Sequence, residues 1–251
     1  MRLLVSLYMW SAWLLAGLVG IPILLAMMVL CSRRTAYEGI RTWIRVSLAI
    51  SFIKVRWTGI DKLDTQRPYI LMGNHINLLD PFIWCLAIPV PFVGVEKKEN
   101  FKIPFYGWLM SRWGNIGIDR KDLEQAKRDL ERAGELIRRD NLWIALMPEG
   151  TRTRDGKLAA FKKGGFHLAL GTGAPIVPIT MNGAYDIQAR GGFWARPGTI
   201  DLIFGEPIDP ANYGPERLDD LIRDVRAAIV GPYTGPKSEL DRTDVPTLVT
   251  P

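Results

Sequence analysis

Cysteine and histidine are scarce in this chain of 251 residues, which contains two of each. Cys31 and Cys85 are too few for a disulfide framework, and neither belongs to a C-x-x-C motif. With only His75 and His167 available, the composition argues against a histidine-rich metal site, and we expect neither a metal nor a cofactor. The sequence also lacks a glycine-rich phosphate-binding loop and a G-x-S-x-G motif, which argues against a P-loop protein and a serine hydrolase.

Charge is absent from the segment Leu3 to Ser32. About 20 apolar residues suffice to span a bilayer as a helix, so this segment is long enough to be membrane-embedded. At this length it must tilt, or break near Gly17, Gly20 and Pro22. A cleaved signal peptide is the alternative, but the apolar run is too long for one and no A-x-A site follows it. Whether the segment spans the bilayer or enters one leaflet stays open.

Basic residues follow the apolar segment and predict that this side faces the cytoplasm, at a cytoplasmic membrane. They are Arg33, Arg34, Arg41 and Arg45. The stretch Glu38 to Trp57 contains an apolar run too short to span a bilayer. We expect a helix at the membrane interface, with its arginines facing lipid phosphates. A buried core helix is the alternative.

The formal net charge of +6 indicates an anionic partner, which could be nucleic acid, an acidic membrane or a phosphorylated small molecule. The stretch from Val95 to Arg120 mixes lysines, aromatic residues and glycines, as in some nucleic-acid-binding surfaces. The uncharged N-terminal segment instead favours a membrane together with an anionic head group. We therefore expect no nucleic acid.

The remainder of the chain has the pattern of an α/β domain, which we expect to contain a central mixed sheet flanked by helices. Strands are expected at Tyr69–Met72, Phe92–Val95, Leu142–Met147, Ile176–Thr180 and Thr199–Phe204. Helices are expected at Asp122–Asp140, where one apolar stripe is surrounded by charges, and at Pro215–Val230. The predicted organisation is a membrane-associated helical module over 1–57, an α/β domain over 58–230 and a poorly ordered tail over 231–251.

The stretch GNHINLLDP combines His75 with an aspartate, Asp80, five positions later. Asp80 before Pro81 is typical of a helix N-cap, in which case its carboxylate serves only the helix. His75 also follows a predicted strand, and the carboxyl ends of strands are where α/β folds build their sites. An aspartate bonded to one ring nitrogen would leave the other nitrogen as a base. The spacing alone is a weak signal, and the two roles are compatible.

A second stretch, LMPEGTRTRDGKLAAFKKGGF, leads from a strand into a basic loop. Arg152, Lys162 and Lys163, with backbone N–H groups of the loop, would suit a phosphate. The alternative is a surface loop in which Glu149 pairs with Arg152. His167, on the helix that follows, is expected to be structural.

Four stretches together resemble the glycerolipid acyltransferase family, and in particular the 1-acylglycerol-3-phosphate acyltransferases. They are NHINLLD, KIPFYGWLMSRWGNIGIDR, MPEGTRT and PIVPI, in the family's order and over roughly residues 55–207. The sequence departs from the family pattern at Met147 and Thr153. It departs also at Ile76 and Asn77, which follow the histidine at positions where the family often has polar or hydroxylated residues.

The resemblance implies that His75 and Asp80 form the catalytic pair. It implies that the acceptor and its phosphate are bound by Arg120, Glu149, Gly150, Thr151 and Arg152. Supporting roles are expected for Asn74, Lys98 and Pro178, the last shaping the site or the acyl path.

The implied reaction transfers a fatty acyl group from a thioester donor, acyl-coenzyme A or acyl carrier protein, to the free hydroxyl of lysophosphatidic acid. The product is phosphatidic acid, and the α/β domain would act on the cytoplasmic side of the membrane. His75 would be the general base and Asp80 would orient it. Alternatives are acylation of glycerol-3-phosphate or another lysophospholipid, a non-catalytic binder of anionic lipid, and a lipid hydrolase. Chain-length preference, donor and oligomeric state are not predicted.

Overall fold

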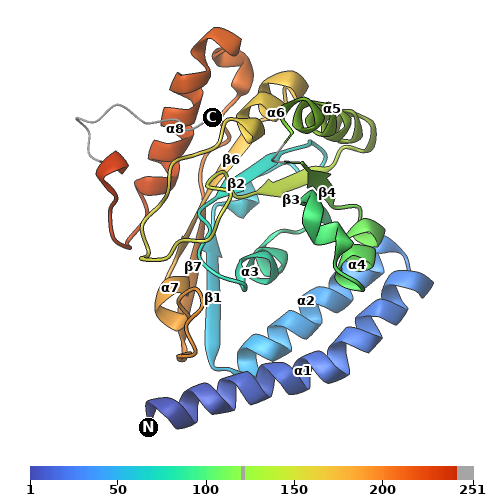
Figure 1. Cartoon of the computed structure of the whole chain (residues 1–251), viewed down its shortest axis with the longest axis vertical. Coiled ribbons are helices and arrows are strands. Elements are labelled where there is room, and N and C mark those ends of the chain that lie inside the picture. Colours follow the sequence, from blue (N-terminus) through green and yellow to red (C-terminus); the bar gives the residue numbers. More distant parts are fainter. Residues whose placement is uncertain (120–121, 242–251) are drawn as a thin grey trace.

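Seven strands form a single sheet in the order β1-β7-β6-β2-β5-β3-β4 (Figure 1). The computed structural model describes residues 1–119 and 122–241. Every neighbouring pair of strands is parallel except β6 and β7, so the expected mixed sheet is confirmed. The strands are β1 (Ile53–Thr58), β2 (Ile70–Gly73), β3 (Phe92–Lys97), β4 (Ile116–Ile118), β5 (Trp143–Leu146), β6 (Ile176–Asn182) and β7 (Gly198–Phe204).

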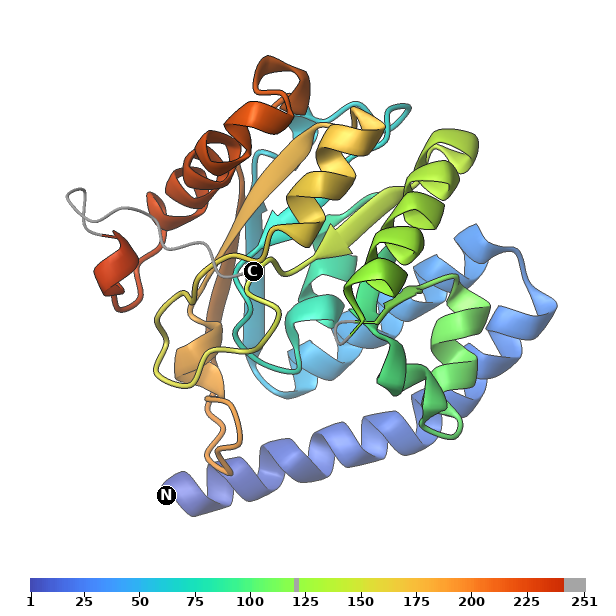
Figure 2. The same ribbon diagram turned by 45° about the horizontal axis from the view of Figure 1, so that its top comes forward.

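Helices cover both faces of the sheet (Figures 1 and 2). One face carries α5 (Leu123–Asp140), α6 (Gly164–Thr172) and α8 (Leu218–Val230). The other carries α2 (Arg33–Ile50) and α3 (Asp80–Ala87). The remaining helical elements are short: α4 (Tyr106–Trp113), α7 (Ala184–Ile187), η1 (Ile60–Lys62), η2 (Lys98–Lys102), η3 (Pro210–Asn212), η4 (Pro215–Arg217) and η5 (Glu239–Asp241).

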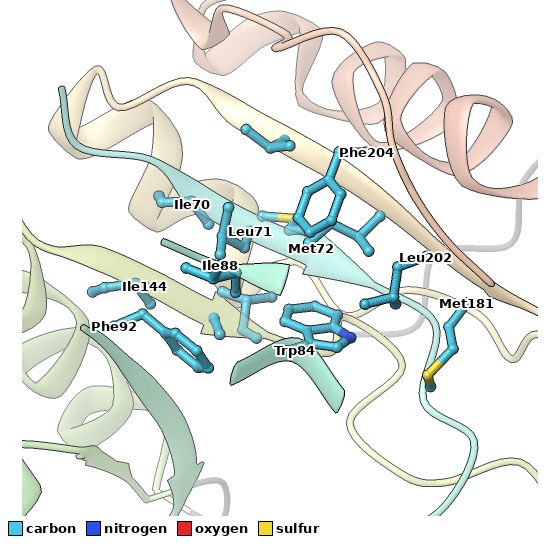
Figure 3. Close-up of a cluster of buried hydrophobic side chains, with 14 of the residues drawn as sticks. Ile70, Leu71, Met72, Trp84, Ile88, Phe92, Ile144, Met181, Leu202 and Phe204 are labelled. Carbon is cyan, nitrogen blue, oxygen red and sulfur yellow. The ribbon is translucent and has the colours of Figure 1, made fainter. Parts of the chain in front are cut away.

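The core lies where α3 packs against the central strands (Figure 3). Trp84 of α3 is 1% exposed, and the strand β2 is buried along its whole length. A strand covered on both faces is expected to be continuously apolar, which is why Ile70, Leu71 and Met72 show no polar alternation. Gly73 ends β2, and a Cβ there would lie 2.5 Å from the Trp84 ring, so only glycine lets α3 approach this closely.

The helix α1 (Arg2–Leu30) lies along the outside of the molecule and packs on α2 (Figure 2). It continues through Pro22 without the break that the sequence allowed. Because Gly20 has no side chain, the Trp43 ring can lie against α1, where its Nε1 donates to the Ala16 carbonyl over 2.9 Å. Within the described residues, α1 is the one helix long and apolar enough to cross a membrane, with a mean hydropathy of 2.5 over an 18-residue stretch.

The expected interfacial helix over 38–57 is shorter than predicted and differently placed. α2 ends at Ile50, and residues 53–58 form the edge strand β1, paired with β7. The partner strand is distant in sequence, so local periodicity did not reveal β1. Arg41 does not face outward as predicted: it bonds to Glu38 and to the carbonyl of Leu86 at the end of α3. Arg45 is exposed.

The five predicted strands are present, and two further strands, β1 and the short β4, were not predicted. Both predicted helices are present as well, as α5 and α8. The tail differs from expectation between Gly231 and Asp241, where it packs against the domain. Tyr233 is 5% exposed, and Arg226 forms a buried ion pair with Asp241 over 2.6 Å. Few apolar residues anchor this segment, so its order depends on polar contacts that composition alone does not predict.

Candidate active site

The loops that follow β2 and β5 meet at one edge of the sheet. The two strands are parallel neighbours, with Met72 opposite Leu146, so their carboxyl ends lie side by side. The loop after β2 carries His75, and the loop after β5 carries Glu149. Two stretches far apart in sequence therefore form one site, at the sheet edge where α/β folds place theirs.

His75 and Asp80 are in direct contact. Nδ1 of the imidazole lies 2.7 Å from Oδ2 of the carboxylate. The His75 side chain is 24% exposed, whereas that of Asp80 is completely buried. When Nδ1 donates its proton to Asp80, Nε2 is the ring nitrogen with a free lone pair. Nε2 makes no hydrogen bond with any residue in the ranges 1–119 and 122–241. The pair therefore has the geometry of an oriented base.

Asp80 does not cap the helix that it begins. The N-cap of α3 is Leu79, and the carboxylate turns back to accept the N–H groups of Ile76 at 2.7 Å and Asn77 at 3.0 Å. Burial raises the pKa of Asp80, while its bonds to His75 and to these two backbone groups lower it. Both oxygens act as acceptors, which is the arrangement that an ionised carboxylate requires. Asp80 thus fixes the orientation of the His75 imidazole and also the backbone of Ile76 and Asn77.

Two buried asparagines attach the His75 loop to its surroundings. Asn74 exchanges two hydrogen bonds with the backbone of Met181 in β6, at 2.7 and 2.9 Å. Asn77 donates to the carbonyls of Ala184 and Gln188 and accepts the N–H of Leu79. The Asn77 side chain is completely used in this way, so it fixes the backbone and does not act on the imidazole.

Glu149 lies beneath the same loop and is 3% exposed. One carboxylate oxygen accepts the N–H of His75 over 2.8 Å, and the other accepts the N–H of Ala159 over 2.7 Å. Burial raises the pKa of Glu149 to about 7, although these two hydrogen bonds oppose the shift. The surface pair with Arg152 that the sequence allowed is not formed. Glu149 therefore connects the backbone of His75 with the backbone of Ala159 through its two carboxylate oxygens.

Gly150, Thr151 and Arg152 form the turn that follows Glu149. Gly150 has φ 69°, which favours glycine, and its N–H bonds to the carbonyl of Met147. The N–H of Thr153 donates to the carbonyl of His75 over 2.8 Å, so this loop is bonded directly to the backbone of His75.

An open hollow of about 430 Å³ lies over this loop, and it is strongly basic. Four cationic side chains and one carboxylate line it: Arg152, Arg154, Lys157, Arg190 and Asp155. None of the four cations forms an ion pair with another described residue. The hollow is therefore suited to an anion.

Three further predicted residues have different surroundings. Arg120 lies outside the described residues. Lys98 lies in η2, beyond the carboxyl end of β3, with its Nζ 3.9 Å from Oδ2 of Asp119. Pro178 lies inside β6 opposite Met72, and its carbonyl accepts the N–H of Gly205. Pro178 is thus part of the sheet.

Sequence reasoning missed Arg190, Arg154 and Lys157 as members of the site. Arg154 and Lys157 lie in the stretch that the sequence marked as a phosphate loop, so its basic composition was the available signal. Arg190 belongs to no motif and lies 38 positions from Arg152, the residue whose carbonyl it binds. No local pattern could have assigned it.

Comparison with known proteins agrees with this arrangement. The Acyltransferase family model matches residues 54–182, which include both loops of the site. The chain is 30% identical over 235 residues to the 1-acyl-sn-glycerol-3-phosphate acyltransferase of Chlamydomonas reinhardtii, across 89% of this chain and 69% of that protein. It belongs to the glycerolipid acyltransferase family.

Other relatives carry the same name. The protein of Borreliella burgdorferi is 31% identical over 76% of this chain and 77% of its own length. That of Limnanthes douglasii is 35% identical over 63% of this chain, which spans 57% of that relative's length. The crystal structure of the 1-acyl-sn-glycerophosphate acyltransferase from Thermotoga maritima matches with a TM-score of 0.73 and 25% identity, over 92% of this chain and 94% of that one. The fold and the family are thereby shown together.

Proposed function

We propose that this protein transfers a fatty acyl group from a thioester donor to the free hydroxyl of 1-acylglycerol-3-phosphate, forming phosphatidic acid. The contact of 2.7 Å between His75 Nδ1 and Asp80 Oδ2 carries this proposal, because it leaves Nε2 as a base on a partly exposed ring. The names of the similar proteins support the choice of acceptor. Acyl-coenzyme A and acyl carrier protein are both suitable donors.

The proposed step is direct transfer. His75 Nε2 takes the proton of the acceptor hydroxyl while its oxygen attacks the thioester carbonyl. The C–O bond forms, the C–S bond breaks, and the sulfur leaves as a thiolate that recovers the proton from the imidazolium. Asp80 stabilises the positive ring during this step. Because a thiolate is a good leaving group, the reaction requires no acyl-enzyme intermediate.

The acceptor's phosphate is assigned to the basic hollow. Only two carbon atoms separate the reacting hydroxyl oxygen from the phosphate ester oxygen, so the two sites must be adjacent. The hydrogen bond from Thr153 N to His75 O joins the two loops and supports this assignment. Thr151 and Arg152 would contact the phosphate, with Arg152 offering two parallel donors, and Glu149 would hold the loop in place.

We also propose that α1 lies in one leaflet of the membrane. Ser6 exchanges hydrogen bonds with Ala195, and Trp10 donates to the carbonyl of Phe193, so the helix is attached to the domain near its start. The bond from Trp43 to Ala16 attaches its middle. A helix held along its length beside the domain is unsuited to leave it and cross the bilayer.

An apolar surface continues from α1 onto α4. A hollow of about 500 Å³ between them is lined by Leu25, Ala26, Val29, Leu30, Phe105 and Trp108. Large exposed apolar patches mark membrane or partner contacts. This surface would bring the active site to the layer where both the acyl chain and the acceptor reside, on the cytoplasmic side that the following arginines predict.

The activity is tested with detergent-purified protein, labelled acyl-coenzyme A or acyl carrier protein, and lysophosphatidic acid. We expect wild type to form phosphatidic acid, and His75→Ala and Asp80→Asn each to lower kcat by about 10²–10⁴-fold. The control is His167→Ala, because this second histidine is exposed on α6. Equal turnover by His75→Ala and wild type would contradict the mechanism. Acyl release without an acceptor would indicate a hydrolase.

The membrane proposal is tested by tryptophan fluorescence with vesicles containing brominated lipid. Trp108 is 49% exposed on α4, whereas Trp143 is 1% exposed in the sheet. Removal of Trp108 should reduce quenching by bromines placed at shallow depth. Removal of Trp143 should leave the quenched fraction unchanged or higher. Quenching independent of Trp108 would count against this face as the membrane contact.

A further inference from the structure

Arg190 is bonded to the loop of the proposed acceptor site although it lies on a different segment. It follows α7, and its Nη1 donates to the carbonyl of Arg152 over 2.7 Å and to Oγ1 of Thr151 over 3.2 Å. Nη1 makes both bonds. Nε and Nη2 make no hydrogen bond with another residue in the described part of the chain. Nη1 of the guanidinium therefore holds the loop, while Nε and Nη2 can donate to a ligand.

The segment that carries Arg190 is held in place at several points. Gln188 Nε2 closes its turn by donating to the carbonyls of Ala189 and Gly192. Asn77 of the His75 loop donates to the carbonyl of Gln188 over 2.9 Å. At the far end, Ser6 of α1 is bonded to Ala195, and Figure 2 shows this orange segment reaching the N-terminal part of α1. Asn77 therefore fixes both the His75 loop and the segment that carries Arg190.

Charge in the hollow also indicates that Arg190 serves a ligand. The one lining carboxylate, Asp155, accepts the N–H of Lys157 and the hydroxyl of Thr153. Asp155 forms no ion pair with Arg190 or Arg152, and no other described carboxylate does, so within the described residues these two positive charges are uncompensated. Like charges held close together repel one another, and an arrangement of this kind is stabilised when a dianion enters it.

We propose that Arg190 is a binding and specificity-determining residue for the acceptor's phosphate monoester. Nε and Nη2 donate to phosphate oxygens, while Nη1 keeps Thr151 and Arg152 in position for the same group. This inference rests on the proposed function, since it assigns the ligand of that site. It predicts that Arg190 affects recognition of the phosphorylated acceptor and leaves recognition of the thioester donor unchanged.

The test compares Arg190→Ala and Arg190→Lys with wild type in steady-state kinetics against lysophosphatidic acid. A lost charge-assisted hydrogen bond should raise the KM for this acceptor by about 10- to 100-fold. The KM for the acyl donor should change by less than about threefold. Lysine keeps the charge without the fork and should restore part of the loss.

Arg196→Ala is the matched control, because Arg196 lies on the same segment, is exposed, and bonds to Asp186 outside the hollow. We expect it to resemble wild type. An unchanged acceptor KM in Arg190→Ala would overturn the proposal. A parallel loss of kcat and of affinity for both substrates, with a lower Tm, would also overturn it and leave Arg190 as a structural clamp.

A binding measurement separates this inference from the proposed function. Titration of wild type and Arg190→Ala with lysophosphatidic acid in detergent requires no turnover. If wild type catalyses no transfer, the proposed function fails, yet weaker binding by Arg190→Ala would still support the phosphate site. Equal binding by the two proteins would overturn the site whatever the activity.

Discussion

The side chain of Glu149 accepts the backbone N–H of His75 over 2.8 Å, so a carboxylate from the loop after β5 holds the backbone of the loop after β2. Its second oxygen holds Ala159 in the same way. A carboxylate placed here repels phosphate, and neither oxygen is available to the acceptor. We therefore expect Glu149 to act on the proposed reaction by positioning His75.

Glu149→Gln should lower kcat with little change in the acceptor KM. Glutamine keeps one carbonyl oxygen but places an NH₂ group against either His75 N or Ala159 N, which leaves a buried donor unpaired. The expected destabilisation is about 1–3 kcal/mol. Steady-state kinetics and denaturant unfolding in the same detergent would measure the two effects. A large increase in acceptor KM alone would indicate direct contact with the acceptor instead.

The pH dependence of stability should contain a contribution from Glu149. Its pKa is about 7 in the folded protein against an ordinary value of 4.5, so between these values the folded state binds more protons than the unfolded state. The free energy of unfolding should therefore fall as pH rises from about 4.5 to 7, and this contribution should be level above that range. Thermal unfolding of wild type and Glu149→Gln across pH 5–8 would show it as a shrinking difference in Tm. A difference that grows with pH would contradict the raised pKa.

Asp241→Ala should destabilise the protein strongly, because it leaves Arg226 buried without its partner. The two side chains are 4% and 1% exposed, and Arg226 also holds the carbonyls of Leu158 and Ala159 beside the basic hollow. Loss of one member of a buried pair costs about 3–5 kcal/mol. Denaturant unfolding measures this cost.

A matched control is available in the pair Arg56–Asp201, which has the same separation of 2.6 Å but exposed side chains. Asp201→Ala should cost less than about 1 kcal/mol. Similar losses in the two variants would show that burial does not set the strength of the Arg226–Asp241 pair.

Gly20→Ala should loosen α1 from α2. A Cβ at this position would lie 2.0 Å from Nε1 of Trp43, so the helices must separate or the indole must leave its bond to Ala16. Overpacking of this kind costs about 1–3 kcal/mol. Gly171→Ala is the control, since nothing lies within 4 Å of a Cβ there and the helical backbone should gain about 0.5–1 kcal/mol. A Tm for Gly20→Ala equal to wild type would contradict close packing of the two helices.

Several features of this protein could be predicted from its sequence because their causes are local. The buried strand β2 is apolar along its length, α5 has an apolar stripe among charges, and α1 has no charge over most of its length. His75 and Asp80 could be paired because five positions and one turn bring them together. Such short-range relationships leave a pattern in the order of the residues.

The tertiary structure decided what depends on contacts between distant segments. Glu149 reaches His75 only because β5 pairs with β2, and β1 exists as a strand only because β7 lies beside it. Arg190 reaches Arg152 because α7 and the segment after it fold back over the loop of β5. No local periodicity encodes these pairings, since each depends on strand order and packing in the folded chain. The sequence by itself therefore determined that His75 and Asp80 lie close enough to pair, whereas the fold determined how the two residues are held and which charges surround them.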